Sequence, residues 1–152
     1  MSTAIHHAVE AARGGRNPSL IARMPSGWAV MGDPQVLRGY SLLLPDPVVP
    51  SLNSLDAAQR VAFLLDMVRL GDALLKSTGC ARVNYEILGN LEPALHAHVV
   101  PRYADEPETH RTKPVWTYDW KARPPFDSAR DDGLRQAIRA AIVSDAPTTT
   151  SR

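Results

Sequence analysis

The chain has 152 residues, of which 44% are hydrophobic, and this is enough for one domain with a buried core. Seventeen basic and sixteen acidic residues give a formal net charge of +1, so the charge does not favour a polynucleotide partner. No apolar run reaches the roughly 20 residues of a membrane-spanning helix, and the N-terminus lacks the pattern of a secretory signal. The lone Cys80 excludes an intrachain disulfide and a Cys-x-x-Cys zinc site. We therefore expect a cytoplasmic protein without a membrane partner.

The first part of the chain is expected to lead into a sheet. Residues 1–18 are small and polar and contain two adjacent glycines, which predicts a flexible lead-in. Residues 20–24 and 28–31 are typical of strands, and the Pro-Ser-Gly between them is a turn signal. Residues 39–45 predict a third strand, which ends at a proline.

One long helix is expected to follow. Ser54 is a plausible N-cap, and the helical pattern continues until Gly79. Apolar and small residues recur along it at helical spacing, and we expect this stripe to face the core. The stripe consists of Ala57, Val61, Leu64, Leu65, Val68, Gly71, Asp72 and Leu75.

The second half of the chain predicts a hairpin and a final helix. Residues 82–88 and 94–100 are typical of strands joined by a short connection. Trp116, Tyr118 and Trp120 then alternate as in a strand, and they either pack this segment onto the sheet or line a substrate or dimer surface. A helix is expected at 127–143, and a disordered tail at 144–152. The order of elements predicts an α+β domain over residues 19–143, with a mainly antiparallel five-stranded sheet.

Two histidines in the last predicted strand carry the most chemical information. His96 and His98 are two residues apart, so their side chains share one face, while Leu95, Ala97 and Val99 point to the other. One imidazole can attack phosphorus and form a covalent phosphoramidate, which divides a difficult displacement into two steps. The other can donate a hydrogen bond to a phosphoryl oxygen. The amide of Asn90, in the turn before the strand, adds a neutral donor for a phosphate.

Two other interpretations of the histidine pair remain open. A His-x-His pair is also a common half-site for zinc or iron, but a complete site needs a third or fourth ligand. Glu106 and His110 are candidates that nothing in the sequence places nearby, and Arg102 would oppose a cation. Both histidines can also be structural members of a sheet.

The motif around the pair resembles the signature of the histidine triad (HIT) superfamily. That signature is His-φ-His-φ-His-φ-φ, where φ is apolar, and this chain has Ala-Leu-His-Ala-His-Val-Val-Pro-Arg at 94–102. Residues 39–45 resemble the Gly-His-x-Leu-x-x-Pro strand of the family, with Tyr40 in place of its histidine. The long helix also comes at the expected point. The resemblance covers about residues 20–103.

The resemblance implies roles for individual residues. His96 matches the nucleophile and His98 matches a histidine that contacts the phosphate, whereas Ala94 replaces the first histidine of the triad. The polar residues expected to bind the substrate are Asn90, Asn84 and, near the nucleotide ribose, Asp33.

The resemblance also implies an activity. It predicts an enzyme similar to the diadenosine-polyphosphate hydrolases, which acts at the α-phosphate of a nucleotide conjugate through a nucleotidyl-histidine intermediate. The small-molecule substrate would be a dinucleoside polyphosphate or a nucleoside phosphoramidate. Because the first histidine is absent, the alternative is a catalytically weak HIT-like protein with a nucleotide-binding or regulatory role. We expect a homodimer, no protein-bound cofactor and no metal site.

Overall fold

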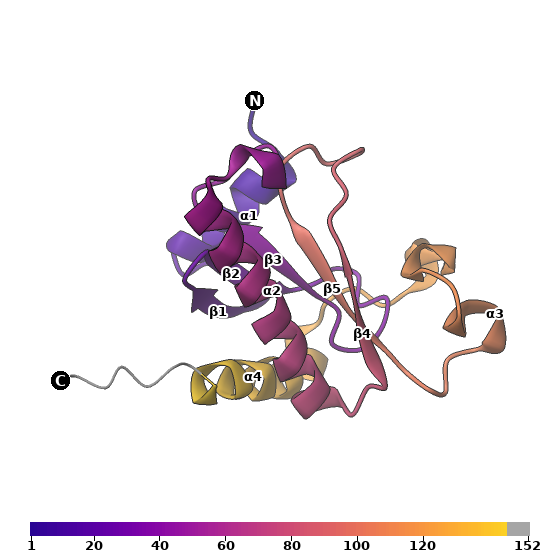
Figure 1. Cartoon of the computed structure of the whole chain (residues 1–152). Coiled ribbons are helices and arrows are strands. Elements are labelled where there is room, and N and C mark those ends of the chain that lie inside the picture. The colour runs from indigo at the N-terminus through magenta and orange to yellow at the C-terminus, as the bar shows by residue number, and fades with distance from the viewer. Residues whose placement is uncertain (146–152) are drawn as a thin grey trace.

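The computed structural model describes residues 1–145, which form a five-stranded sheet covered by helices (Figure 1). The strands are β1 (Leu20–Met24), β2 (Gly27–Met31), β3 (Ser41–Pro45), β4 (Arg82–Glu86) and β5 (Ala97–Arg102). Their order in the sheet is β1-β2-β3-β5-β4, and every neighbouring pair is antiparallel. The predicted α+β fold with a mainly antiparallel five-stranded sheet is therefore confirmed.

Two long helices, α2 (Ala57–Thr78) and α4 (Ser128–Ser144), pack against each other and against the sheet. In Figure 1, α2 crosses in front of the strands and α4 lies below it. The helix α1 (Ala4–Arg13) packs against β3 from the other side. A short helix α3 (Glu108–Arg111) and three single 3₁₀ turns, η1 (Leu52–Ser54), η2 (Val115–Thr117) and η3 (Trp120–Ala122), lie in the connections.

The long helix begins two residues later than the sequence pattern predicted. Ser54 ends the 3₁₀ turn η1, and the N-cap is Asp56, whose carboxylate accepts a hydrogen bond from the Gln59 backbone N–H at 2.8 Å. The Gln59 side chain accepts in return from the Asp56 N–H, which completes a capping box. At the other end, Gly79 adopts the left-handed conformation (φ 67°) that ends a helix, as expected.

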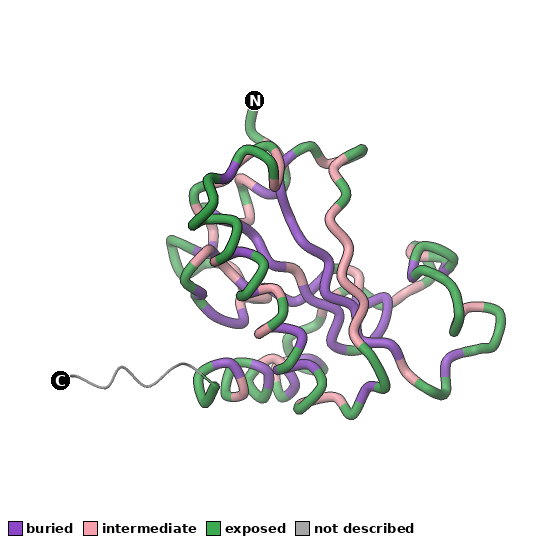
Figure 2. Tube along the Cα trace, viewed as in Figure 1, coloured by how far each residue is buried: buried purple, intermediate pink, exposed green. Residues whose placement is uncertain are grey.

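The prediction that one stripe of α2 faces the core is wrong for most of its members. Val61 is 66% exposed and Leu65 is 56% exposed, and Leu64, Val68 and Leu75 are also on the surface. Figure 2 shows much of α2 as exposed, whereas β5 is buried throughout. The side chains that reach the core come from Phe63, Leu70, Ala73 and Leu74. The helix has apolar residues on both sides, so their spacing does not decide which side is inside.

The N-terminal segment also differs from the expected lead-in. Residues 4–13 form α1, and its side chains of Ile5 and Val9 are buried against Val30 and Leu44 of the sheet. This helix buries an apolar stripe at helical spacing, which the small and polar composition of the segment conceals. The boundaries of the domain, residues 19–143, stay a prediction.

The C-terminal aromatic segment is not a strand. Trp116 and Trp120 lie in the 3₁₀ turns η2 and η3, and Tyr118 lies between them. The last predicted helix is present as α4. The expected tail, 144–152, lies outside the described residues apart from Ser144 and Asp145. None of the described helices is long and apolar enough to cross a membrane.

Candidate active site

The sheet presents two chemically different faces at β5. Ala97 and Val99 belong to the main core beneath α2, together with Leu95. His98 pairs in register with Leu42 of β3 and Glu86 of β4, and its side chain points to the opposite face. The predicted separation of the histidines from the apolar residues is therefore confirmed, because successive side chains of a strand alternate.

The histidine face carries a cavity of about 470 Å³ between α1 and the C-terminal segment. His96 and His98 line it, next to the loop that connects β4 to β5. Residues far apart in the sequence complete the lining: Ile5, Asp33, Tyr40, Leu42, Leu88, Gly89, Asn90, Leu91, Glu92, Trp116 and Trp120. A cavity of this size, with few polar groups among apolar and aromatic walls, is typical of a small-molecule site.

The hydrogen bond of His96 determines which of its ring nitrogens carries a proton. His96 Nδ1 lies 2.8 Å from the carbonyl oxygen of Ala94. A carbonyl can only accept, so Nδ1 must donate and must carry the proton. In the neutral imidazole the lone pair then lies on Nε2, which is the form that a nitrogen nucleophile requires.

His98 has the opposite arrangement. Its Nδ1 lies 2.6 Å from the hydroxyl of Tyr40, and among the described residues this hydroxyl has no other hydrogen-bond partner. Burial raises the pKa of Tyr40 well above its usual value, so the phenol keeps its proton. This buried O–H has a partner only if it donates a hydrogen bond to Nδ1. The proton of the neutral His98 ring is therefore on Nε2, which makes this nitrogen a donor.

His98 stays neutral over a wide pH range. Burial and, to a smaller extent, the nearby His96 lower its pKa from 6.5 to about 4. The centroids of the two imidazole rings are 4.8 Å apart, and the rings are nearly perpendicular. The site thus places a potential nucleophile, one residue before β5, beside a neutral N–H donor on that strand.

The ring of Tyr40 is fixed from three sides. It packs directly over the Cα of Gly32, where any Cβ would collide with the ring. Trp120 meets it edge-on at 5.5 Å, and the His98 ring lies nearly parallel to it at 6.0 Å. The sequence shows Tyr40 only as a departure from the family motif, whereas the structure makes it the partner of His98.

The predicted substrate-binding residues do not all reach the cavity. Asn90 and Asp33 line it, and both are exposed to solvent. The Asp33 carboxylate also accepts a hydrogen bond from the Phe126 backbone N–H at 3.0 Å. Asn84 does not line this cavity; its side-chain oxygen accepts from Arg102 at 2.9 Å. The prediction that Asn84 binds substrate has no support in this geometry, since its oxygen is committed to a structural contact.

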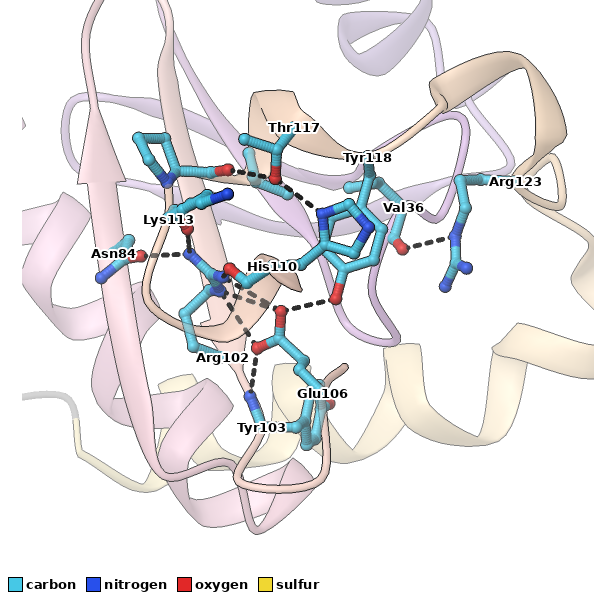
Figure 3. Close-up of polar contacts among 12 residues, drawn as sticks. Val36, Asn84, Arg102, Tyr103, Glu106, His110, Lys113, Thr117, Tyr118 and Arg123 are labelled. Carbon is cyan, nitrogen blue, oxygen red and sulfur yellow. Dashed lines mark hydrogen bonds and ion pairs between the residues drawn. The ribbon is translucent and has the colours of Figure 1, made fainter. Parts of the chain in front are cut away.

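Arg102 holds the segment after β5 against the sheet (Figure 3). Its guanidinium donates to Glu106 at 3.0 and 3.1 Å, and to the carbonyl oxygens of His110 and Lys113. Glu106 also accepts from the Tyr118 hydroxyl at 2.7 Å. Burial alone would raise the pKa of Glu106, but the hydrogen bonds from Arg102 and Tyr118 hold it below its usual value. Arg102 and Glu106 therefore form a buried salt bridge that fixes this segment.

The side chain at the first position of the triad is a methyl group in apolar surroundings. Ala94 is buried in the cluster that contains Ile5 and Val9 of α1. Within residues 1–145, no three histidine, cysteine, aspartate or glutamate side chains are grouped so that they could hold a metal ion. Glu106 and His110, the candidates for further ligands, belong to the contacts of Arg102.

Comparison with protein-family models gives no match, and comparison with curated protein sequences gives none either. Solved structures do match. A histidine triad protein from Bradyrhizobium japonicum is 25% identical and has a TM-score of 0.69, over 82% of this chain and 91% of that chain. A histidine triad protein from Marinobacter aquaeolei VT8 is 16% identical with a TM-score of 0.73, over 95% and 98%.

A third solved structure agrees with these two. It is described as a hypothetical histidine triad nucleotide-binding protein from Sulfolobus tokodaii, and it is 14% identical with a TM-score of 0.68, over 91% of this chain and 92% of that chain. The likenesses extend over most of the chain and share one fold. They show that this chain has the fold of the histidine triad proteins, and its His-x-His motif lies at the start of β5, between β3 and β4.

Proposed function

We propose that the protein is a nucleotide hydrolase or nucleotidyl transferase. It would act at the α-phosphate of a nucleotide conjugate, such as a dinucleoside polyphosphate or a nucleoside phosphoramidate. The observation that carries this proposal is the hydrogen bond from His96 Nδ1 to the Ala94 carbonyl, which leaves the Nε2 lone pair available in the cavity. Nε2 attacks phosphorus, the bond to the leaving group breaks, and a nucleotidyl-histidine forms. Water then attacks the same phosphorus and releases the nucleoside monophosphate.

The other polar groups of the cavity would serve the phosphate and the ribose. The Nε2–H of His98 donates to a phosphoryl oxygen, and the amide of Asn90 provides a second neutral donor. Asp33, which lines the same cavity, would accept a hydrogen bond from a ribose hydroxyl.

Trapping of the covalent intermediate tests the mechanism. The protein is incubated with a diadenosine polyphosphate or adenosine 5′-phosphoramidate, quenched in acid-free denaturant, digested, and mapped by mass spectrometry. We expect an adenylyl group on His96, and no adduct or turnover in His96→Ala. An adduct on a different residue, or undiminished turnover in His96→Ala, would contradict the mechanism.

The second candidate is a catalytically weak protein that binds nucleotides, and Ala94 favours it. The first histidine of the triad is replaced by a methyl group in an apolar cluster, so His96 has one polar neighbour fewer than the family motif provides. Tight binding of adenosine 5′-monophosphate, measured by calorimetry, without turnover of either conjugate would support this candidate. Turnover that depends on His96 would support the enzyme.

We propose a homodimer formed through the outer side of α2. Val61, Leu64, Leu65 and Val68 form an exposed apolar stripe on this helix, and β4 is an edge strand of the sheet that the described residues form. A second copy that covers the stripe would remove this apolar surface from water. Light scattering after size exclusion should give twice the chain mass, and Leu65→Glu should give the monomer. A monomeric wild-type chain would contradict the proposal.

A further inference from the structure

The histidine cavity has an aromatic wall, which we define as Trp116 and Trp120. Their ring centroids are 4.7 Å apart, and the ring planes differ by 10°, so the indoles are stacked. Both line the same cavity as His96 and His98. Trp116 is nevertheless 42% exposed, which is unusual for an indole that is part of a packed pair.

The wall stands directly beside the proposed phosphate-binding histidine. The centroid of the Trp116 ring is 5.1 Å from that of His98, with the rings nearly perpendicular. The ring of His98 is also in contact with the ring of His96, with the two centroids 4.8 Å apart. A phosphate that contacts both histidines would therefore have the substituents of its phosphorus within reach of the Trp116 indole.

The wall is held in place before any ligand binds. The indole N–H of Trp116 donates to the carboxylate of Glu86 on β4, and that of Trp120 donates to the Val115 carbonyl at 3.3 Å. Arg123, three residues after Trp120, donates to the Val36 carbonyl at 2.8 Å. Ligand binding would not have to order these side chains, so little of the stacking free energy would be lost to entropy.

The same segment is fastened to the sheet by the buried contacts of Arg102. This guanidinium holds the carbonyls of His110 and Lys113, and Tyr118 between the two tryptophans donates to Glu106. Arg102 is the last residue of β5, the strand that carries His98, so its contacts connect the aromatic wall to that strand. A fixed distance between a flat surface and a phosphate donor is what recognition of a phosphate-linked ring requires.

We propose that the exposed indole of Trp116 binds a planar aromatic group of the substrate by stacking, so that the preferred substrates are phosphate conjugates that carry such a ring near phosphorus. The ring is either the base of the nucleotide or an aromatic leaving group, and both share the chemistry that the wall recognises. This inference rests on the proposed function for the position of the phosphate at His96 and His98.

Binding of two matched pairs of phosphate-bearing probes tests the proposal without any need for turnover. The first pair is adenosine 5′-monophosphate and ribose 5-phosphate, which differ by the base. The second is 2-phenylethyl phosphate and 2-cyclohexylethyl phosphate, which differ in the planarity of the ring. Dissociation constants are measured by calorimetry for the wild type, Trp116→Leu and Trp116→Phe, with Trp28→Leu as a matched control outside the cavity.

We expect the planar member of at least one pair to bind about tenfold more tightly to the wild type, because stacking on an aromatic side chain has this order of effect. Trp116→Leu should abolish that preference, whereas Trp116→Phe should retain most of it. Loss of preference in the first pair assigns the wall to the base, and loss in the second assigns it to the leaving group. Equal preferences in the wild type and Trp116→Leu for both pairs would overturn the proposal.

The outcome is separable from that of the proposed function. If no adduct forms on His96 but the preference depends on Trp116, the nucleotidyl-histidine mechanism fails and the aromatic wall stands. If an adduct forms while the preferences do not change in Trp116→Leu, the mechanism stands and the wall is only structural.

Discussion

The hydroxyl of Tyr40 lies 2.6 Å from Nδ1 of His98, although the two residues are 58 positions apart in the chain. The bond joins β5 to the segment just before β3, and it fixes the His98 ring as an Nε2–H donor. The family motif has a histidine at the position of Tyr40. In this chain a phenol that keeps its proton takes the position, and its partner is the histidine assigned to the phosphate.

Tyr40→Phe should impair catalysis more than binding. The phenyl ring keeps its packing over Gly32 and against Trp120, but Nδ1 of His98 loses its donor, and the imidazole can then adopt the wrong tautomer. We expect kcat for adenosine 5′-phosphoramidate to fall roughly 10- to 100-fold with KM changed much less, since positioning groups act mainly on the transition state.

Tyr103→Phe is the matched control for this substitution, because its hydroxyl donates to the Arg38 carbonyl at the surface and does not touch the cavity. A similar loss of kcat in Tyr103→Phe would mean that the effect of Tyr40→Phe is not specific to His98.

The lowered pKa of His98 predicts a loss of stability in mild acid. The pKa is about 4 in the folded protein and near 6.5 in the unfolded chain, so between these values the unfolded chain binds more protons. The stability that His98 contributes as a neutral ring is therefore complete above about pH 6.5 and decreases as the pH falls towards 4. With allowance for solvent screening, we expect a loss of roughly 1–2 kcal/mol at pH 5.

Urea unfolding at pH 7 and pH 5 measures this loss. His98→Gln should show a smaller difference between the two pH values than the wild type does, whereas His7→Gln, at an exposed histidine of α1, should leave the difference unchanged. The same pH dependence in wild type and His98→Gln would show that His98 is not the responsible group.

The parts of the site that sequence reasoning predicted are local in the chain. Alternation of side chains along a strand predicted that His96 and His98 share a face, and this rule needs no tertiary information. Both histidines do line the cavity, although the strand β5 begins only at Ala97. Asn90 reaches the cavity because it precedes the same strand. The contact of Tyr40 with His98 and the position of Trp116 depend on strand order and on the contacts of Arg102, so no spacing in the sequence indicates them.

The error in α2 has a different cause. Phe63 and Leu70 are buried, while Val61 and Leu65 are exposed, and all four are apolar. A periodic pattern indicates which side of a helix is buried only when the other side is polar. In α2 both sides are apolar: one side packs on the sheet, and the proposed homodimer would cover the other.

The contact between Arg102 and Glu106 should be important for stability. The two side chains are almost completely buried, at 8% and 2% exposure. Arg102→Ala would leave the Glu106 carboxylate buried without its cation, and we expect a loss of roughly 3–5 kcal/mol in the free energy of unfolding. Chemical denaturation followed by far-UV circular dichroism measures it.

An exposed ion pair provides the comparison for that loss. Lys76 and Asp145 are both largely exposed, so Lys76→Ala should cost less than about 1 kcal/mol. Equal losses in the two variants would indicate that the burial of Arg102 and Glu106 adds nothing to the stability of the segment.

A glycine-to-alanine substitution should have opposite effects on stability at two helical positions. A Cβ at Gly71 of α2 would collide with the phenol of Tyr85 on β4, whereas a Cβ at Gly133 of α4 would meet nothing within 4 Å. Gly133→Ala should therefore stabilise the protein by roughly 0.5–1 kcal/mol through helix propensity. Gly71→Ala gains the same propensity but must displace Tyr85, and we expect a net loss of roughly 1–2 kcal/mol. Thermal unfolding of the two variants beside the wild type measures both effects, and a rise in Tm for Gly71→Ala would show that α2 does not need this close approach to the sheet.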